Sequence, residues 1–89
     1  MKGIITVLGH DRVGIIARVC VFLSGANINI LDISQTIVQG FFNMVMVVDL
    51  SGASLTFEDI VGGLNAAGDE LGVQIKLQRE EIFNSMHRI

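Results

Sequence analysis

The chain has 89 residues, a formal net charge of −3 and a hydrophobic content of 51%. This length fits one domain, and no apolar stretch reaches the ~20 residues that span a bilayer, so neither a membrane segment nor a signal peptide is expected. The acidic balance argues against a nucleic-acid partner, which selects basic surfaces. A single cysteine, Cys20, excludes an intramolecular disulfide and a Cys-x-x-Cys metal site, and it favours a reducing cytoplasm.

The first element expected along the chain is a strand over residues 2–8, rich in β-branched side chains and ended by Gly9. From Val13 the apolar residues recur at helical spacing, which predicts a helix. Asp11 stands where an N-cap carboxylate accepts hydrogen bonds from amides one turn ahead. Asn27, just past the expected helix end, tolerates the left-handed conformation found there.

Residues 28–38 predict a second strand whose apolar residues change phase. One extra residue near Ile30–Leu31, a β-bulge, returns the apolar residues to one face. Gln39-Gly40 predicts a tight hairpin turn, and the returning strand, residues 41–50, is apolar on both faces, which is typical of a central strand covered on both sides. Past the bulge, the opposite face of the second strand is expected to carry Asp32, Ser34 and Thr36.

Residues 57–71 carry an apolar stripe at helical spacing, with Ser54 or Thr56 as the cap. Glycines within it weaken the helix, so packing has to hold it, and they allow a close approach to the sheet or to a neighbour. Residues 73–78 alternate apolar and polar side chains, which predicts an outer strand with one solvated face. The tail, residues 80–89, predicts a short amphipathic helix.

The resulting order is βαββαβ plus a tail, which divides the chain into a domain at 1–79 and a tail at 80–89. Two right-handed crossovers around a hairpin give an α+β, ferredoxin-like sandwich: an antiparallel sheet in the order 4-1-3-2 with two helices on one face. The bulged second strand then forms an edge with open backbone groups. Because a long apolar edge has to be covered or paired, we expect a homodimer through it.

Several functions known for this topology lack their residues here. Metal-carrier domains need paired cysteines after the first strand, and RNA-recognition domains need stacking aromatics on the first and third strands, where only Phe41 lies in a matching stretch. His10 and His87 have no defined ligand spacing, so no metal site is expected. No nucleophile–base set and no glycine-rich phosphate loop is present, so we expect neither an enzyme nor a cofactor.

The segment TVLGHDRVGIIARVCVFLSGANINI, residues 6–30, resembles the opening of an ACT domain. In that family a first strand meets a loop similar to D-R-P-G, then a helix, then a G-x-N-I stretch that opens the second strand. The resemblance covers nearly all of residues 2–79, with Val13 in place of the usual proline and Asn27 in place of the glycine. The ending EEIFNSMHRI is similar to that of small, stand-alone, uncharacterised bacterial ACT-domain proteins.

The resemblance implies a sensor of an amino acid or related carboxylate that pairs into a homodimer and regulates a separate protein. It places the ligand at the dimer interface, near the first loop and the start of the second strand. A helix start offers unpaired amides and a positive dipole end that suit a carboxylate, and glycines let the backbone approach a ligand. The binding residues carried over are Gly9, His10, Asp11, Arg12, Val13, Gly14 and Asn29, with Leu31 and Asp32 close by.

Alternative roles stay open at this point. Asp11 could cap the helix or contact the ligand; with Asn29 or Asp32 it could also accept from a ligand ammonium. Arg12 could be a solvated or salt-bridged surface charge, or a ligand or dimer contact, and Asn29 could satisfy backbone groups at a strand start. A second hypothesis is a protein-interaction module that binds no ligand and uses its dimer surface or its C-terminal helix.

Overall fold

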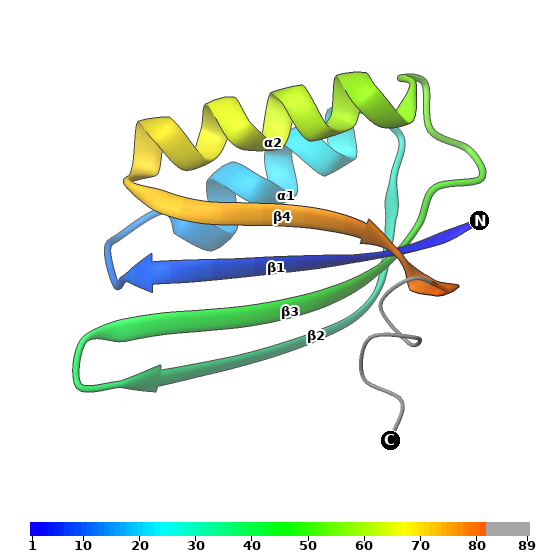
Figure 1. The fold of residues 1–89 in the computed structure, drawn as a ribbon. Helices are drawn as coiled ribbons and strands as arrows, with labels where there is room; N and C mark the ends of the chain where they lie inside the picture. Colours follow the sequence, from blue (N-terminus) through cyan, green and yellow to red (C-terminus); the bar gives the residue numbers. More distant parts are fainter. Residues whose placement is uncertain (82–89) are drawn as a thin grey trace.

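The computed structural model describes residues 1–81, which form a four-stranded antiparallel sheet with two helices on one face (Figure 1). The strands lie in the order β2-β3-β1-β4, so the predicted α+β, ferredoxin-like architecture is confirmed. Among these residues no helix is long and apolar enough to cross a membrane. The elements are β1 (Lys2–His10), α1 (Ile15–Gly25), β2 (Asn29–Val38), β3 (Phe41–Asp49), α2 (Phe57–Leu71) and β4 (Val73–Arg79).

The tail helix predicted for residues 80–89 falls mostly outside the described residues, which end at 81. The described residues therefore do not test the predicted tail helix.

The edge strand β2 contains the predicted bulge. Ile30 lies opposite Val48 and Asp32 lies opposite the adjacent Val47, so Leu31 is the inserted residue. The isoleucines beyond the bulge pair with buried residues of β3 and therefore share its helix-covered side. The other side of β2 carries the polar residues Asp32, Ser34 and Thr36, as predicted.

Three local predictions are also confirmed. The hairpin turn has positive φ at both Gln39 (50°) and Gly40 (82°), which matches the twist of the flanking strands. Asn27, with φ of 58°, follows α1, and its side-chain amide donates to the Gly52 carbonyl at 2.8 Å. Thr56 caps α2, because its hydroxyl oxygen accepts from the amide of Asp59 at 3.1 Å.

The core lies between the sheet and the two helices, and close approaches at glycine hold α2 in place. A side chain on Gly63 would collide with the ring of Phe22 on α1. A Cβ on Gly68 would lie 2.7 Å from the carbonyl oxygen of Val73 on β4. These contacts confirm that small residues let α2 lie against its neighbours. The largest fully buried side chains are Ile5, Val7, Ile15, Val19, Leu23, Met44, Met46, Val48, Ile60 and Leu64.

The junction between β1 and α1 differs from the prediction in two respects. The strand does not end at Gly9, because Gly9 and His10 continue the ladder against Phe42 and Phe41 of β3. The helix starts at Ile15 rather than at residue 13, because Gly14 takes a left-handed conformation with φ of 96°.

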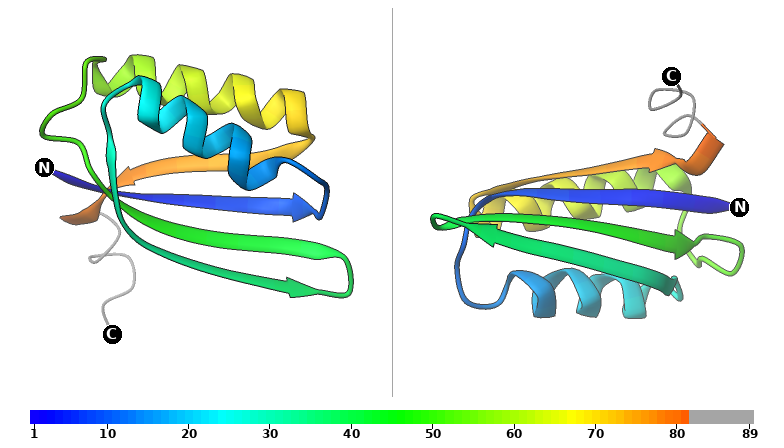
Figure 2. Two further views of the ribbon diagram at one scale, coloured as in Figure 1. Left: turned by 180° about the vertical axis from the view of Figure 1, so that it is seen from behind. Right: turned by 90° about the horizontal axis from the view of Figure 1, so that it is seen from below.

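The strand β3 is central, as predicted, but helices cover only one of its faces (Figure 2). On the other face Phe41 is 52% exposed, and Val45 and Val47 are half-buried. The expectation of cover on both sides is therefore wrong within the described residues. Both helices follow right-handed crossovers and so lie on the same side of the sheet.

Candidate functional site

The start of α1 has no side-chain cap. Its N-cap residue is Gly14, and no acidic residue lies in its first turn. Asp11 instead donates its backbone amide to the Gly40 carbonyl at 2.7 Å, so the predicted Asp11 cap is wrong. The hairpin tip holds Asp11 three residues before the N-cap Gly14, too early in the chain to cap the first turn. The first-turn amides of α1 therefore have no side-chain acceptor among residues 1–81 and form the positive end of the helix.

Arg12 connects this loop to the end of the other helix. Its guanidinium donates to the carbonyls of Leu71 at 3.2 Å and Glu70 at 3.5 Å, the last residues of α2. Terminal helix carbonyls lack intrahelical donors and carry the negative end of the dipole, so a cation is favoured there. Arg18 of α1 pairs with the Glu70 carboxylate at 2.9 Å. Arg12 therefore anchors the loop to the end of α2, a role that differs from those considered from the sequence.

A hollow of about 220 Å³ lies beside the start of α1. The loop and the first helical turn form one wall, and the ends of β2 and β3 form the other. This volume is below the roughly 300–1,000 Å³ of pockets for drug-sized ligands, so within one protomer the hollow has room for only a very small molecule or part of one. Its lining residues are Asp11, Arg12, Gly14, Ile15, Ile16, Ala17, Gln35, Ile37 and Phe42.

Three of the loop residues carried over from the resemblance do not line this hollow. Gly9 packs inside the sheet, where a Cβ would lie 2.7 Å from Cγ1 of Val73. The ring of His10 stacks on Phe41 with centroids 4.6 Å apart, on the face of the sheet without helices. Val13 is almost fully exposed. Of the predicted loop site, the hollow brings together Asp11, Arg12 and Gly14.

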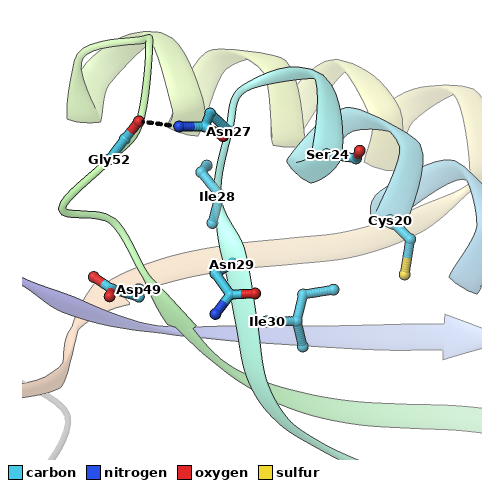
Figure 3. Close-up of a pocket in the computed structure, with 8 residues that line it drawn as sticks. All are labelled: Cys20, Ser24, Asn27, Ile28, Asn29, Ile30, Asp49 and Gly52. Atoms are coloured by element: carbon cyan, nitrogen blue, oxygen red, sulfur yellow. Dashed lines mark hydrogen bonds between the residues drawn. The ribbon is translucent and has the colours of Figure 1, made fainter.

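A second hollow, of about 590 Å³, surrounds the start of β2 (Figure 3). It includes the predicted Asn29, but sequence reasoning missed the residues of α1, β3 and the following loop that join it. The register of the hairpin contained one signal for them, because Asn29 pairs with Asp49. The lining residues are Cys20, Ser24, Asn27, Ile28, Asn29, Ile30, Asp49 and Gly52.

Asp49 supplies the negative charge of this second hollow. Its carboxylate accepts from the Ser51 hydroxyl at 2.5 Å and from the Ser51 amide at 2.9 Å. These two hydrogen bonds hold the pKa of Asp49 below its ordinary value, so the group is ionised at neutral pH.

The two hollows lie beside the start of β2 and the start of α1, and these two points are at opposite ends of the sheet (Figure 2). The β1–α1 loop follows His10, which pairs with Phe41 at the start of β3, whereas Asn29 pairs with Asp49 at its end. A strand of nine residues spans roughly 26 Å at ~3.3 Å per residue. Within one protomer, therefore, Asn29 and the α1 start do not reach the same small molecule.

Leu31 and Asp32 lie on β2 toward its Asn29 end. Leu31 is the bulge residue and is exposed. The carboxylate of Asp32 accepts from the amide of Ile33 at 2.9 Å. Among residues 1–81, no group of three or more His, Cys, Asp or Glu side chains could hold a metal ion.

The βαββαβ order defines a ferredoxin-like domain, and the open start of α1 beside a small hollow is a candidate site for a small anion. Residues 3–78 match the family model of the ACT domain. The UPF0237 protein of Bifidobacterium longum is 60% identical, with 99% of this chain and 98% of the relative covered. The UPF0237 protein of Clostridium acetobutylicum is 54% identical over the full length of both chains. The chain belongs to the ACT-domain family, whose members are ligand-binding regulatory domains.

Solved structures agree with this assignment. An ACT domain protein from Streptococcus pneumoniae is 40% identical, with a TM-score of 0.81 and 93% of each chain covered. The regulatory subunit of aspartate kinase from Thermus thermophilus has the same fold at 22% identity, with a TM-score of 0.66 over 86% of this chain and 50% of that one.

Proposed function

We propose that this protein is a stand-alone regulatory domain that binds an amino acid or related carboxylate as a homodimer and acts on a separate protein. The observation that carries the proposal is the uncapped start of α1 beside a small hollow. Backbone amides and a positive dipole end suit a carboxylate there. The regulatory subunit of aspartate kinase, named above, supports the regulatory role, and the free thiol of Cys20 supports a reducing, cytoplasmic setting.

The dimer is proposed to form through β2, whose outer edge has no strand partner among the described residues. Apolar side chains lie exposed along it, including Ile33 (40%) and Ile37 (56%). An exposed apolar edge is a template for pairing with another strand. Pairing two copies through this edge would satisfy its backbone groups and cover these isoleucines.

In such a dimer, the two hollows that lie far apart within one protomer would meet across the interface. Antiparallel pairing over the full length of β2 puts Asn29 of one copy against Val38 of the other. Ile37, next to Val38, lines the hollow at the α1 start. The Asn29 end of one protomer would then adjoin the α1 start of its partner. We propose that the ligand carboxylate meets the α1 amides of one copy and that its ammonium meets acceptors such as Asn29 of the other.

The dimer is tested by sedimentation of two variants. Ile33→Lys, near the middle of β2, sets like charges side by side across the paired edge and should yield monomers. Gln74→Lys, also at an exposed position but on the opposite edge strand, should leave the mass unchanged. A monomeric wild-type protein, or an Ile33→Lys variant that stays dimeric, would refute pairing through β2.

The ligand is sought by a thermal-shift screen against the twenty amino acids and common folate and purine metabolites. A ligand at 100 times its Kd adds about 2.7 kcal/mol, which raises the Tm of a domain of this size by several degrees. If no compound of the panel raises the Tm, a protein-interaction module would be favoured over a sensor.

A complementation experiment tests whether the site is shared between protomers. Ala17→Glu blocks the α1 hollow with a negative charge, and Asn29→Ala removes the amide at the other hollow; each homodimer should lose the ligand. A mixed dimer of the two keeps one site with both parts intact, so random mixing should restore about a quarter of the sites. If calorimetry detects no ligand binding in the mixture, the two residues do not form one site across the dimer interface.

A further inference from the structure

The second edge of the sheet, formed by β4, is also open. β4 has β1 as its one neighbour in the described sheet, so the outward backbone groups of residues 73–77 have no strand partner among residues 1–81. Such groups can pair with an extended segment of another chain, in which case main-chain hydrogen bonds give affinity and side-chain pockets give specificity.

A cleft of about 550 Å³ lies between this strand and α2. The helix comes so close at Gly68 that a Cβ there would touch the backbone of Val73. Side chains of an added strand that point toward the helices would therefore lie beside α2. The cleft is lined by Asn65, Gly68, Asp69, Val73, Gln74, Ile75 and Lys76.

The charges along this edge differ between its two faces. α2 contains four acidic residues and no basic one, and its Asp69 lines the cleft. Lys76 is exposed and alternates with the buried Ile75, so it belongs to the face without helices. A complementary strand would carry an acidic side chain opposite Lys76 and a basic neighbour directed toward Asp69.

A second copy of this chain does not fit the β4 edge. Lys76 is the middle residue of β4, so full-length antiparallel self-pairing would set two Lys76 side chains directly opposite each other, which is destabilising. If β2 edges pair as proposed above, β4–β4 pairing would also extend the sheet into an open filament. These charges favour a segment of a different protein as the occupant.

We propose that the β4 edge and its cleft with α2 receive an extended segment of a partner protein as a fifth strand, with an acidic residue opposite Lys76 and a basic residue next to Asp69. This surface is separate from the ligand site and from the β2 edge. It is a candidate contact for the regulated protein, and it goes beyond the proposed function without requiring that a ligand be bound.

The probes are three capped nine-residue peptides of alternating threonine and valine. One carries a central Glu with a Lys beside it, one carries two Glu and one carries two Lys at these positions. Nuclear magnetic resonance titration of the full chain should move the amide signals of residues 73–79 and of the Asp69 turn. The mixed peptide should bind about threefold or more tightly than either control, in keeping with cross-strand charge pairs.

Two further variants make this result decisive. In Lys76→Glu the preference should pass from the mixed peptide to the doubly basic one, whereas Asn43→Lys, an exposed change on β3, should leave it unchanged. Methylating the peptide nitrogens that face β4 should abolish binding. No shift in β4 at about 1 mM peptide, or equal binding of the methylated peptide, overturns the proposal. Neither result bears on the small-molecule site, which the Asn29→Ala and Ala17→Glu variants test separately.

Discussion

The two helices of this protein begin in opposite ways. The start of α2 is capped by Thr56, and Glu58 and Asp59 in its first turn complement the positive end of the helix. The start of α1 follows Gly14 in a left-handed conformation and has neither a side-chain cap nor an acidic first turn. One helix satisfies its own first amides, whereas the other leaves them without a side-chain acceptor.

The difference separates a structural helix start from a candidate binding one. Capping and acidic first-turn residues each stabilise a helix, so their joint absence at α1 gives up stability that α2 retains. The uncapped amides lie next to a hollow, where a bound anion could accept the hydrogen bonds that no described side chain accepts. Substitutions at the two helix starts should therefore have contrasting effects.

The largest effect on stability is expected at Gly14. Its φ of 96° is unfavourable for a residue with a Cβ, so Gly14→Ala should lower the free energy of unfolding by ~1–2 kcal/mol. No atom lies within 4 Å of the added Cβ, so the loss would report backbone strain alone. Gly25→Ala, with equally open space but no positive φ, is the matched control and should be neutral or stabilising in urea unfolding. Equal losses in both variants would contradict this assignment.

A smaller loss is expected at the capped helix. Thr56→Ala removes the acceptor for the Asp59 amide and should destabilise the domain by ~1 kcal/mol. Thr56→Ser keeps the hydroxyl and should retain most of the stability. If the alanine variant unfolds at the wild-type urea concentration, the cap of α2 contributes nothing and the contrast between the helices loses its energetic basis.

Adding an acid to α1 should make its start resemble that of α2. Ala17→Glu puts a carboxylate in the exposed first turn and should stabilise the domain by ~0.3–1 kcal/mol while preventing an anionic ligand from binding. Ala17→Gln has nearly the same size and should have little effect on stability. Thermal unfolding together with calorimetric titration measures both quantities; retention of ligand binding in the glutamate variant would remove α1 from the site.

The smallest effect concerns the loop that leads to α2. The hydrogen bonds from Ser51 lower the pKa of Asp49 relative to its ordinary value of 3.8. A carboxyl whose folded pKa is depressed stabilises the protein above its unfolded pKa, and this contribution is lost as the pH falls through the folded pKa. Stability should therefore decrease below about pH 4, and Ser51→Ala should make that decrease shallower. Carboxyl groups titrate between about pH 2 and pH 6. Unfolding curves measured over this range would show whether stability falls less steeply with decreasing pH in Ser51→Ala than in the wild-type protein.

Much of the fold could be predicted from the sequence because the signals are local. Apolar spacing indicated all six elements, the change of phase indicated the bulge at Leu31, and Gln39-Gly40 indicated the hairpin turn. Thr56 could be named as a candidate cap because a cap and its acceptor amide lie within one turn of each other. Each of these signals depends on residues a few positions apart.

The candidate site was decided by contacts that no short-range pattern describes. Asp11 lost its expected role as a cap because the hairpin tip at Gly40 holds its backbone, and Arg12 acts on the end of α2, almost sixty residues along the chain. Asn29 and the α1 start, adjacent parts of one site by resemblance, lie at opposite ends of β3. The sequence by itself determined which elements form and in what order, because periodicity and turn chemistry act locally. Only the packing of those elements decided which polar groups meet, since that depends on the path of the whole chain.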